Sequence, residues 1–287
     1  MNILITGKNG YVANRLLKFL NNQRYFKRID SISVRDNVDI HKLEGYDTCI
    51  HTSALVHKKE NNYTEADYFL VNTELTIDLA RKAKEQGIKH FIFLSTMAVY
   101  GVESGEITAT NTLMPKTFYG KSKLAAEHAL LDLQDDKFTV SIVRPPMVYG
   151  PNCPGNYVQL RKLAKRTLIF PKVHNQRSML FIDNLCEFLL QLINYRDSGI
   201  FHPQDANYMN SSKLVSEIAR YSNHRVFFSK AVGFVLTNFF SNVSLINKVF
   251  GNLTYSKGIS TYRDNSYQQA DFKAAIQKTE RDWDGDE

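Results

Sequence analysis

The sequence predicts an α/β fold: a doubly wound parallel sheet with a smaller lobe at the C-terminal side. Strand and helix patterns alternate through the first 150 residues, which is typical of a parallel sheet covered by helices on both faces. A glycine-containing turn directly follows the first strand pattern, and the regular alternation ends after Gly150. With 287 residues, 43% of them hydrophobic, the chain is long enough for a substantial core.

The elements follow from short apolar runs and from helical periodicity. The longest expected helix covers residues 64–86, because apolar side chains recur near helical period and Gly87 is a suitable residue just past its end. The other expected helices cover about residues 11–22 and the segment that contains Lys123. The expected strands are residues 2–6, 29–34, 47–55, 90–95 and 138–145.

The domain boundary is expected near Gly150, where the loop PNCPGN begins. We expect residues 1–150 to form one domain, with a returning segment near residues 178–200, and residues 151–287 to form most of the second lobe. The apolar stretch 231–250 is interrupted by asparagines and is too polar for a confident membrane span. It predicts a covered helix of the C-terminal lobe, with an amphipathic surface helix at a membrane or a partner protein as the alternative.

Composition limits the cellular setting and the partners. Three widely spaced cysteines form no metal-ligand pattern and cannot all pair, which favours a reducing cytoplasm, and the start MNILITG does not resemble a signal peptide. The net charge is +7, but lysines and arginines occur along the chain beside acidic residues. We therefore expect an anionic small-molecule substrate rather than nucleic acid, no stable membrane insertion and no metal site.

The turn after the first strand predicts a dinucleotide site of the Rossmann type. Gly7, Gly10 and Ala13 follow residues 2–6 with G-x-x-G-x-x-A spacing. This spacing suits a tight turn, a close approach to a pyrophosphate and close packing of helix on sheet. The helix N-terminus then faces the phosphates. The cofactor-binding residues expected here are Gly7, Asn9, Gly10, Tyr11 and Val12.

Lys123 lies four positions after Tyr119, so the two side chains project from the same face of a helix. A tyrosine with a pKa near 10 is a poor acid or base at neutral pH, and a neighbouring cation makes proton transfer feasible. The hydroxyl of Thr96, from another segment, can hold a substrate oxygen beside the phenol. This combination suits hydride transfer at a carbinol or a ketone if a nicotinamide is bound nearby.

Seven ordered motifs resemble the extended short-chain dehydrogenase/reductase family, specifically its NAD-dependent epimerases and dehydratases. The motifs are TGKNGYVA, DTCIHTSA, VNT, FLSTMAVYG, YGKSK, RPPMVYGP and RSMLFIDNL, and they cover almost the whole chain. The chain is most similar to UDP-N-acetylhexosamine 4-keto reductases and UDP-sugar 4-epimerases of bacterial capsule and O-antigen synthesis. The resemblance implies a sugar-nucleotide-binding C-terminal lobe.

The resemblance also implies roles for individual residues. Tyr119 is the expected acid and base, Lys123 lowers its pKa and contacts the nicotinamide ribose, and Thr96 orients the sugar oxygen. Met97 is expected beside the substrate. Asn72 is expected to be a scaffold residue that ties its helix to a strand.

On the cofactor side, the resemblance implies that Ala54, Lys123 and Pro146 line the site. Arg35 and Asp36 follow the second strand. An arginine there favours the 2′-phosphate of NADP, whereas an acidic residue reads the ribose of NAD. The sequence favours NADP(H) slightly, through Arg35, and NAD(H) is the alternative.

On the substrate side, Arg177 resembles the family arginine that binds the substrate diphosphate, and Asn156 is a further candidate contact. Met147 replaces an asparagine that is common in the family, so one expected polar contact is absent. Asp183 is expected to cap a helix. His51 is the single histidine expected in the interior of the cofactor domain.

The resulting function is oxidation or reduction at C4 of a nucleotide sugar. The first hypothesis is an NAD(P)H-dependent reductase of a UDP-4-keto-6-deoxy-N-acetylhexosamine in surface polysaccharide synthesis. The alternative is a UDP-hexose or UDP-N-acetylhexosamine 4-epimerase with tightly bound NAD, and a remote alternative is a non-catalytic dinucleotide sensor. The resemblance also implies a homodimer formed through the helix of Tyr119 and the helix at residues 64–86.

Overall fold

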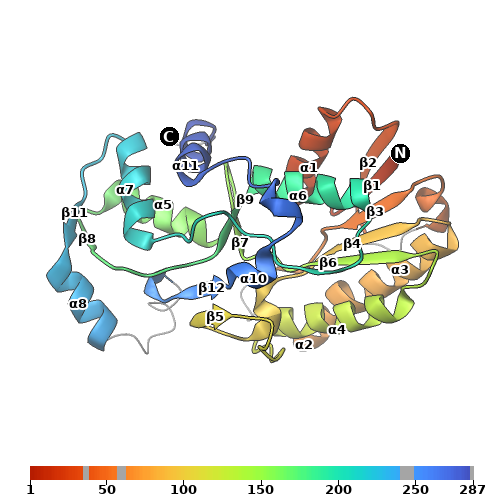
Figure 1. The fold of residues 1–287 in the computed structure, drawn as a ribbon, viewed down its shortest axis with the longest axis horizontal. Coiled ribbons are helices and arrows are strands. Elements are labelled where there is room, and N and C mark those ends of the chain that lie inside the picture. Colours follow the sequence, from red (N-terminus) through yellow and green to blue (C-terminus); the bar gives the residue numbers. More distant parts are fainter. Residues whose placement is uncertain (35–38, 57–62, 240–248, 285–287) are drawn as a thin grey trace. The chain divides into compact units, whose positions relative to one another are not determined.

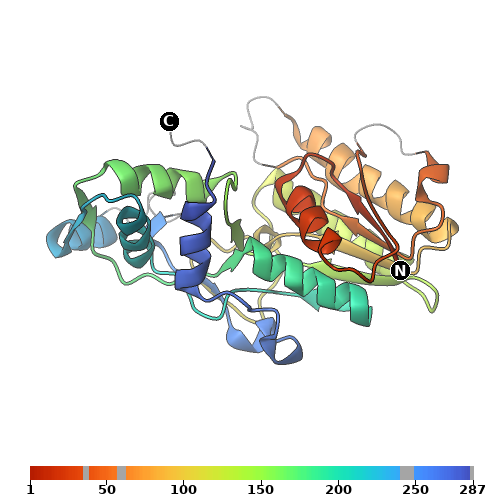
Figure 2. The same cartoon turned by 90° about the horizontal axis from the view of Figure 1, so that it is seen from above.

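The computed structural model describes residues 1–34, 39–56, 63–239 and 249–284 (Figures 1 and 2). The chain forms two compact units, each of which is built from separate segments. Unit 1 comprises residues 1–101, 112–145 and 186–202, and unit 2 comprises residues 102–111, 146–185 and 203–287.

Unit 1 contains a six-stranded sheet in which all neighbouring strands are parallel, in the order β10-β6-β4-β3-β1-β2. The strands are β1 (Asn2–Thr6), β2 (Arg28–Ile32), β3 (Thr48–His51), β4 (His90–Leu94), β6 (Thr139–Val143) and β10 (Gly199–Phe201). The predicted α/β class is therefore confirmed. The strand order reverses between β1 and β3, and ligands of such sheets bind at the carboxyl ends of the strands at this switch point.

The helices of unit 1 pack on both faces of the sheet, with α1 above it and α3 and α4 below it in Figure 1. The helices are α1 (Tyr11–Asn21), α2 (Glu65–Phe69), α3 (Leu75–Glu85), α4 (Phe118–Leu133) and the later part of α6 (Ile182–Tyr195), with 3₁₀ turns η1 (Ile40–Leu43) and η4 (Met97–Tyr100). Buried residues of α3 and α4, including Leu79 and Leu130, pack against strand residues such as Phe91 and Ile142.

The helix expected over residues 64–86 is interrupted by a π turn. It begins after Thr64, whose hydroxyl accepts a hydrogen bond from the Asp67 amide, and the Asp67 side chain accepts one from the Thr64 amide. A π-helical segment, η3 (Leu70–Glu74), then separates α2 from α3. Helical periodicity alone does not predict such a bulge, which is often associated with functional sites.

Unit 2 combines short parallel strand pairs with helices. The pairs are β5–β12, β7–β9 and β8–β11. The strands are β5 (Gly105–Ile107), β7 (Met147–Tyr149), β8 (Ile169–Pro171), β9 (Met179–Phe181), β11 (Phe227–Ser229) and β12 (Leu253–Tyr255). The helices are α5 (Asn156–Arg166), α7 (Ser211–Tyr221), α8 (Lys230–Phe239), α10 (Lys257–Ser260), the 3₁₀ turn η5 (Arg263–Asn265) and α11 (Phe272–Arg281).

Three expectations about individual residues need correction. The start of α8 is not covered, because only Gly233 is buried among residues 230–234. Asp183 lies inside the first turn of α6 and pairs with Lys278 at 2.5 Å, so it is not the residue that caps the helix. His51 is not the single buried histidine of unit 1, because His90 is buried there too. The His90 ring bonds the Ser141 hydroxyl on the neighbouring strand.

The three cysteines are buried, and none of them forms a disulfide bond. Within the described ranges, no group of three or more His, Cys, Asp or Glu side chains could hold a metal ion. In the same part of the chain, every helix is too short or too polar to cross a bilayer.

A buried ion pair fixes α5 to α11 in unit 2. Arg161 and Glu280 lie 2.8 Å apart, with side chains that are 6% and 3% exposed. The Tyr157 hydroxyl also donates to Glu280, and the Arg161 guanidinium stacks over Trp283. Burial raises the pKa of Glu280, while Arg161 opposes this rise. Glu280 therefore depends on Arg161 for its charge.

We expect Arg161→Met to lower the free energy of unfolding by about 3–5 kcal/mol, because it leaves the Glu280 carboxylate buried without its cation. The double variant Arg161→Met/Glu280→Leu should recover most of this loss, since neither charge then remains. Urea denaturation of the three proteins measures both effects. A double variant that is less stable than Arg161→Met would contradict the assignment.

Candidate active site

The turn after β1 lies against the segment after β3, at the switch point of the sheet. The Thr52 hydroxyl donates to the Thr6 carbonyl at 2.7 Å and fixes the two strand ends. Gly7 has a φ of +100°, and a Cβ atom there would lie 2.9 Å from Thr52 Oγ1 and 3.1 Å from the Ser53 amide nitrogen. Only glycine fits this position, so the turn keeps its backbone open to a ligand.

The N-terminus of α1 suits an anion. Its N-cap residue is Gly10, which offers no side chain to the N–H groups of the first turn. By contrast, Thr64 and Thr117 cap α2 and α4 through their hydroxyls. Backbone N–H groups and the helix dipole at such an end favour a phosphate. The residues present therefore fit the pyrophosphate of a dinucleotide, as the glycine spacing predicts.

The remaining predicted cofactor residues are placed as follows. Asn9 has a φ of 77° and is exposed in the turn, and Val12 lies in the first turn of α1. Ala54 lies in the segment after β3. Pro146 is buried and belongs to unit 2. Arg35 and Asp36 lie outside the described residues, so the preference for NADP(H) stays a prediction.

Asn72 connects the segment after β3 to α4. Its side chain accepts a hydrogen bond from the Leu55 amide at 2.7 Å and donates to the Leu55 carbonyl at 3.2 Å and to Ser122 Oγ at 3.0 Å. The neighbouring Thr73 hydroxyl donates to the Ser122 carbonyl at 2.8 Å. Both residues lie in the π turn η3. Asn72 is a scaffold residue, as predicted.

Thr96 and Tyr119 act on each other, because the Thr96 side chain lowers the pKa of the Tyr119 phenol. Thr96 Oγ1 accepts a hydrogen bond from the Ala98 amide at 3.1 Å, as the N-cap of η4, so the Thr96 proton is directed elsewhere. Burial raises the pKa of Tyr119 to about 12, Thr96 lowers it, and Tyr68 raises it further. The neutral phenol is therefore strongly favoured at neutral pH.

A glycine allows α4 to approach η4. A Cβ atom at Gly120 would lie 2.8 Å from the Ala98 carbonyl oxygen and 3.0 Å from Pro115 Cβ. Met97, next to Thr96 in the chain, is buried, and its amide donates to the Pro145 carbonyl at 3.0 Å. The close packing at Gly120 therefore sets the distance between Thr96 and Tyr119.

Lys123 is 1% exposed, and its ammonium donates to the Leu94 carbonyl at 2.9 Å, at the end of β4. The same group lies 4.3 Å from the centroid of the Phe93 ring. Burial lowers the pKa of Lys123 to about 7, and the charge of Glu127 opposes this. Lys123 is not among the groups that shift the pKa of Tyr119. The expected lowering of that pKa by Lys123 therefore stays a prediction.

A buried polar network surrounds Glu127, one helical turn after Lys123. The Ser95 hydroxyl donates to its carboxylate, and Arg144 binds it through two nitrogens, the shorter contact being 2.5 Å. Arg144 also donates to the Tyr100 hydroxyl at 2.9 Å, which lies 2.7 Å from a ring nitrogen of His202. No sequence motif predicted this network, although Glu127 shares a helix face with Lys123.

His51 is held as a neutral ring at the end of β3. One ring nitrogen contacts Thr6 Oγ1 at 2.6 Å and the other contacts Thr76 Oγ1 at 2.9 Å. Burial, together with the charge of Lys123, lowers the pKa of His51 to about 3. His51 therefore contributes to the structure of the switch point rather than to proton transfer near neutral pH.

The two predicted phosphate-side residues belong to unit 2. Arg177 is partly buried, its guanidinium donates to the Gly251 carbonyl at 3.0 Å, and its backbone pairs with Met209. Asn156 is exposed and is the first residue of α5. The structure thus brings Thr96, Tyr119 and Lys123 together in unit 1 and places these two residues in unit 2.

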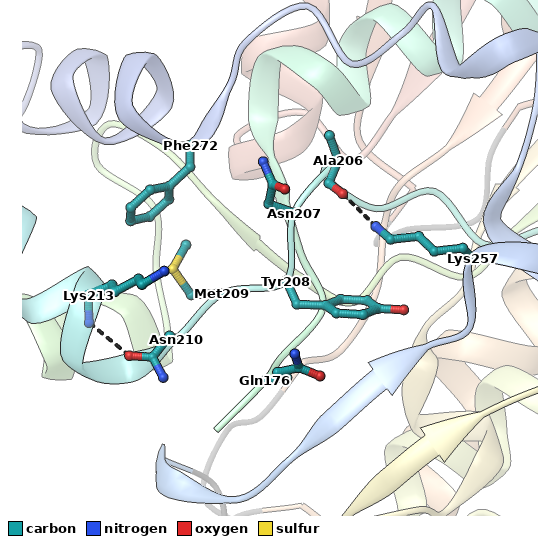
Figure 3. Close-up of a pocket in the computed structure, with 9 residues that line it drawn as sticks. All are labelled: Gln176, Ala206, Asn207, Tyr208, Met209, Asn210, Lys213, Lys257 and Phe272. Atoms are coloured by element: carbon teal, nitrogen blue, oxygen red, sulfur yellow. Dashed lines mark hydrogen bonds between the residues drawn. The ribbon is translucent and has the colours of Figure 1, made fainter. Parts of the chain in front are cut away.

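Unit 2 also contains a cavity of about 400 Å³ that sequence reasoning did not predict (Figure 3). Lys257 donates to the Ala206 carbonyl at 2.6 Å and lies 4.5 Å from the centroid of the Tyr208 ring. Gln176 and Met209, which adjoin Arg177 through the chain and through backbone pairing, also line it. Its lining includes two lysines and no acidic side chain: Gln176, Ala206, Asn207, Tyr208, Met209, Asn210, Lys213, Lys257 and Phe272.

The low pKa of Lys123 predicts a pH-dependent stability. The unfolded chain protonates this lysine below a pH of about 10.4, whereas the folded chain does so only below about 7. Between these values the unfolded state binds the extra proton, so stability rises with pH. The unfolding free energy of the wild type, relative to Lys123→Met, should rise by a few kcal/mol from about pH 7 to pH 10.

Urea denaturation at several pH values measures this difference. The exposed Lys42→Met is the control and should show no such trend. Parallel pH profiles for the wild type and Lys123→Met would contradict the buried location of the amine.

Gly120→Ala should separate α4 from η4. We expect a loss of stability of about 1–3 kcal/mol, typical of overpacking, and a lower turnover. Gly258→Ala is the matched control, because a Cβ atom there meets nothing within 4 Å. Thermal unfolding and turnover of both variants test the contact, and equal stability of the two would refute it.

Comparisons with known proteins identify the family of the chain. Residues 3–207 match the NAD dependent epimerase/dehydratase family. A UDP-glucose 4-epimerase of Vibrio cholerae is 28% identical over 246 residues, covering 76% of this chain and 74% of that protein. The N-acetyl-alpha-D-glucosaminyl-diphospho-ditrans,octacis-undecaprenol 4-epimerase of Escherichia coli O157:H7 is 28% identical over 245 residues, with coverages of 78% and 73%.

The fold resembles that of UDP-glucuronic acid 4-epimerase from Bacillus cereus in complex with NAD, with a TM-score of 0.76, 18% identity and 98% coverage of both chains. The resemblance carried by the sequence motifs is thus confirmed at the level of the family. The chain belongs to the NAD dependent epimerase/dehydratase family of extended short-chain dehydrogenase/reductase enzymes, which use a nicotinamide dinucleotide.

Proposed function

We propose that this enzyme interconverts C4 epimers of a sugar attached to a diphosphate, with a UDP-N-acetylhexosamine as substrate. The observation that carries the proposal is the meeting of Thr96, Tyr119 and Lys123 at the end of β4: Thr96 acts on the pKa of Tyr119, and the Lys123 ammonium binds the Leu94 carbonyl. Two relatives with about three quarters of their length matched are 4-epimerases, one of a UDP-sugar and one of a diphospho-undecaprenol-linked sugar. Both of these names describe a sugar bound to a diphosphate.

The chain's own residues would perform the proton transfer and the positioning. When bound at the turn after β1, the dinucleotide supplies an acceptor and donor of hydride for C4. Tyr119 takes the proton of the 4-hydroxyl and later returns it, and Thr96 holds the oxygen beside the phenol. A phenol with a pKa near 12 is a weak base at neutral pH. We therefore propose that the charge of Lys123 lowers this pKa in the working enzyme.

For the substrate diphosphate, we propose Arg177 as the main contact and Asn156 as a further one. The planar guanidinium of arginine suits bidentate binding of phosphate. Burial lowers the pKa of Arg177, so an anion beside it compensates for the loss of water around the charge. Met97 is proposed to line the sugar site, and Pro146 and Ala54 to line the cofactor site.

A second candidate is an NADPH-dependent reductase of a UDP-4-keto-6-deoxy-N-acetylhexosamine. The sequence Arg35-Asp36 after β2 favours it, because an arginine there suits the 2′-phosphate of NADP. A role in capsule or O-antigen synthesis fits both candidates. The retained Tyr119 and Lys123 argue against a non-catalytic sensor. We also propose a cytoplasmic homodimer formed through α2, α3 and α4.

The two candidates differ in their need for a reductant. Purified protein is incubated with UDP-GlcNAc, UDP-GalNAc and a UDP-4-keto-6-deoxy-N-acetylhexosamine, with and without NADPH or NADH. We expect epimer formation without added reductant. Oxidation of the cofactor that is stoichiometric with the keto sugar, without any epimerisation, would instead favour the reductase.

Tyr119→Phe should lower turnover by at least about a hundredfold, because it removes the group that exchanges the proton. Binding of the dinucleotide, measured by calorimetry, should be largely retained, since the turn after β1 is unchanged. Tyr46→Phe is the control, because it also removes a phenol hydroxyl. The Tyr46 hydroxyl bonds Asp30 rather than Thr96. Turnover of Tyr119→Phe near that of the wild type would refute the assignment.

A further inference from the structure

The positive charge of unit 2 is concentrated in two stretches that contain no acidic residue. Residues 146–182 include six lysines and arginines, and residues 218–263 include six more, without a single aspartate or glutamate. This corrects the expectation that basic residues are spread evenly beside acidic ones. β8 belongs to the first stretch and β11 to the second, and these two strands pair with each other.

The β8–β11 ribbon has a buried face and an exposed apolar face. Phe170 of β8 is 1% exposed and packs against Phe228 and Phe250. On the other face, Ile169 and Phe227 are cross-strand partners that are 59% and 69% exposed. Leu168, next to Ile169, is 66% exposed. We call Leu168, Ile169 and Phe227 the ribbon face.

Two lysines follow the strands of the ribbon. Lys172 directly follows β8, and its amide donates to the Ser229 carbonyl at 2.9 Å. Lys230 directly follows β11 and begins α8, and Figures 1 and 2 show β8 and α8 side by side. Both lysines line a cavity of about 460 Å³, together with Val173, His174, Asn175, Gly233, Phe234, Phe250 and Asn252. This lining includes no acidic side chain.

We propose that the ribbon face and its two flanking lysines dock unit 2 on the surface of a bilayer that contains anionic lipids. Leu168, Ile169 and Phe227 enter the boundary between headgroups and acyl chains, where apolar side chains gain by leaving water. Lys172 and Lys230 bind lipid phosphates at the cavity. This is binding to a surface, not insertion of a helix across the membrane.

Charge complementarity selects this occupant. A nucleic acid would use the cations but would leave the exposed Phe227 and Ile169 in water. A protein partner would have to be both acidic and apolar, whereas an anionic bilayer presents phosphates directly above an apolar layer. The inference is independent of which sugar the enzyme converts.

Vesicle flotation tests the proposal with the full chain. Wild-type protein should float with phosphatidylglycerol–phosphatidylcholine vesicles and much less with phosphatidylcholine alone or at high salt. Ile169→Ser/Phe227→Ser and Lys172→Gln/Lys230→Gln should each lower the bound fraction, with about a tenfold loss in partition coefficient. Met114→Ser is the matched control, because Met114 is 70% exposed but belongs to unit 1.

Thermal unfolding confirms that each variant is folded, and epimerase activity on a water-borne UDP-sugar provides a second check on folding. Inorganic phosphate in place of vesicles separates phosphate binding from bilayer binding. Three outcomes overturn the proposal: no flotation of the wild type, binding of the apolar double variant equal to that of the wild type, or self-association without lipid that the same substitutions abolish. The last would assign the face to contacts between copies of the chain.

Discussion

The side chain of Asn72 fixes the two segments on which the chemistry of unit 1 depends. It holds both the amide and the carbonyl of Leu55, after β3, and the Ser122 hydroxyl on α4. A buried amide leaves polar groups unsatisfied if either partner moves, so the three bonds act together. These bonds fix the position of the segment after β3 relative to α4, the helix that carries Tyr119 and Lys123.

Electrostatics adds a second constraint around the same helix. Lys123 is buried, and the charge of Glu127 opposes the effect of burial on its pKa. Glu127 is in turn held by Arg144 and Ser95, from the ends of β6 and β4. A charge buried without such partners would be neutralised. The network therefore holds the pKa of Lys123 near neutral pH, where a bound group can change its protonation.

Local patterns predicted much of the fold and part of the site. The boundaries of β1 and the turn at Gly7 follow from short-range signals, and the spacing of Tyr119 and Lys123 follows from one helical turn. The π turn was not predicted, because helical periodicity does not report the hydrogen bonds that Asn72 within it makes to distant Leu55 and Ser122. The pairing of Arg144 with Glu127 joins two elements, and helical spacing cannot supply it. The two stretches of unit 2 without acidic residues can be found in the sequence. The sequence does not show that β8 of the first stretch pairs with β11 of the second.

The central claim is that the bond to hydrogen at C4 breaks while Tyr119 exchanges the proton of the 4-hydroxyl. The most direct measurement is turnover of a UDP-N-acetylhexosamine that carries deuterium at C4, followed by analysis of the product. The account predicts a normal primary isotope effect on a chemical step and deuterium retained at C4 of the epimerised sugar. Epimerisation with no isotope effect under single-turnover conditions, or with the deuterium lost to water, would contradict it.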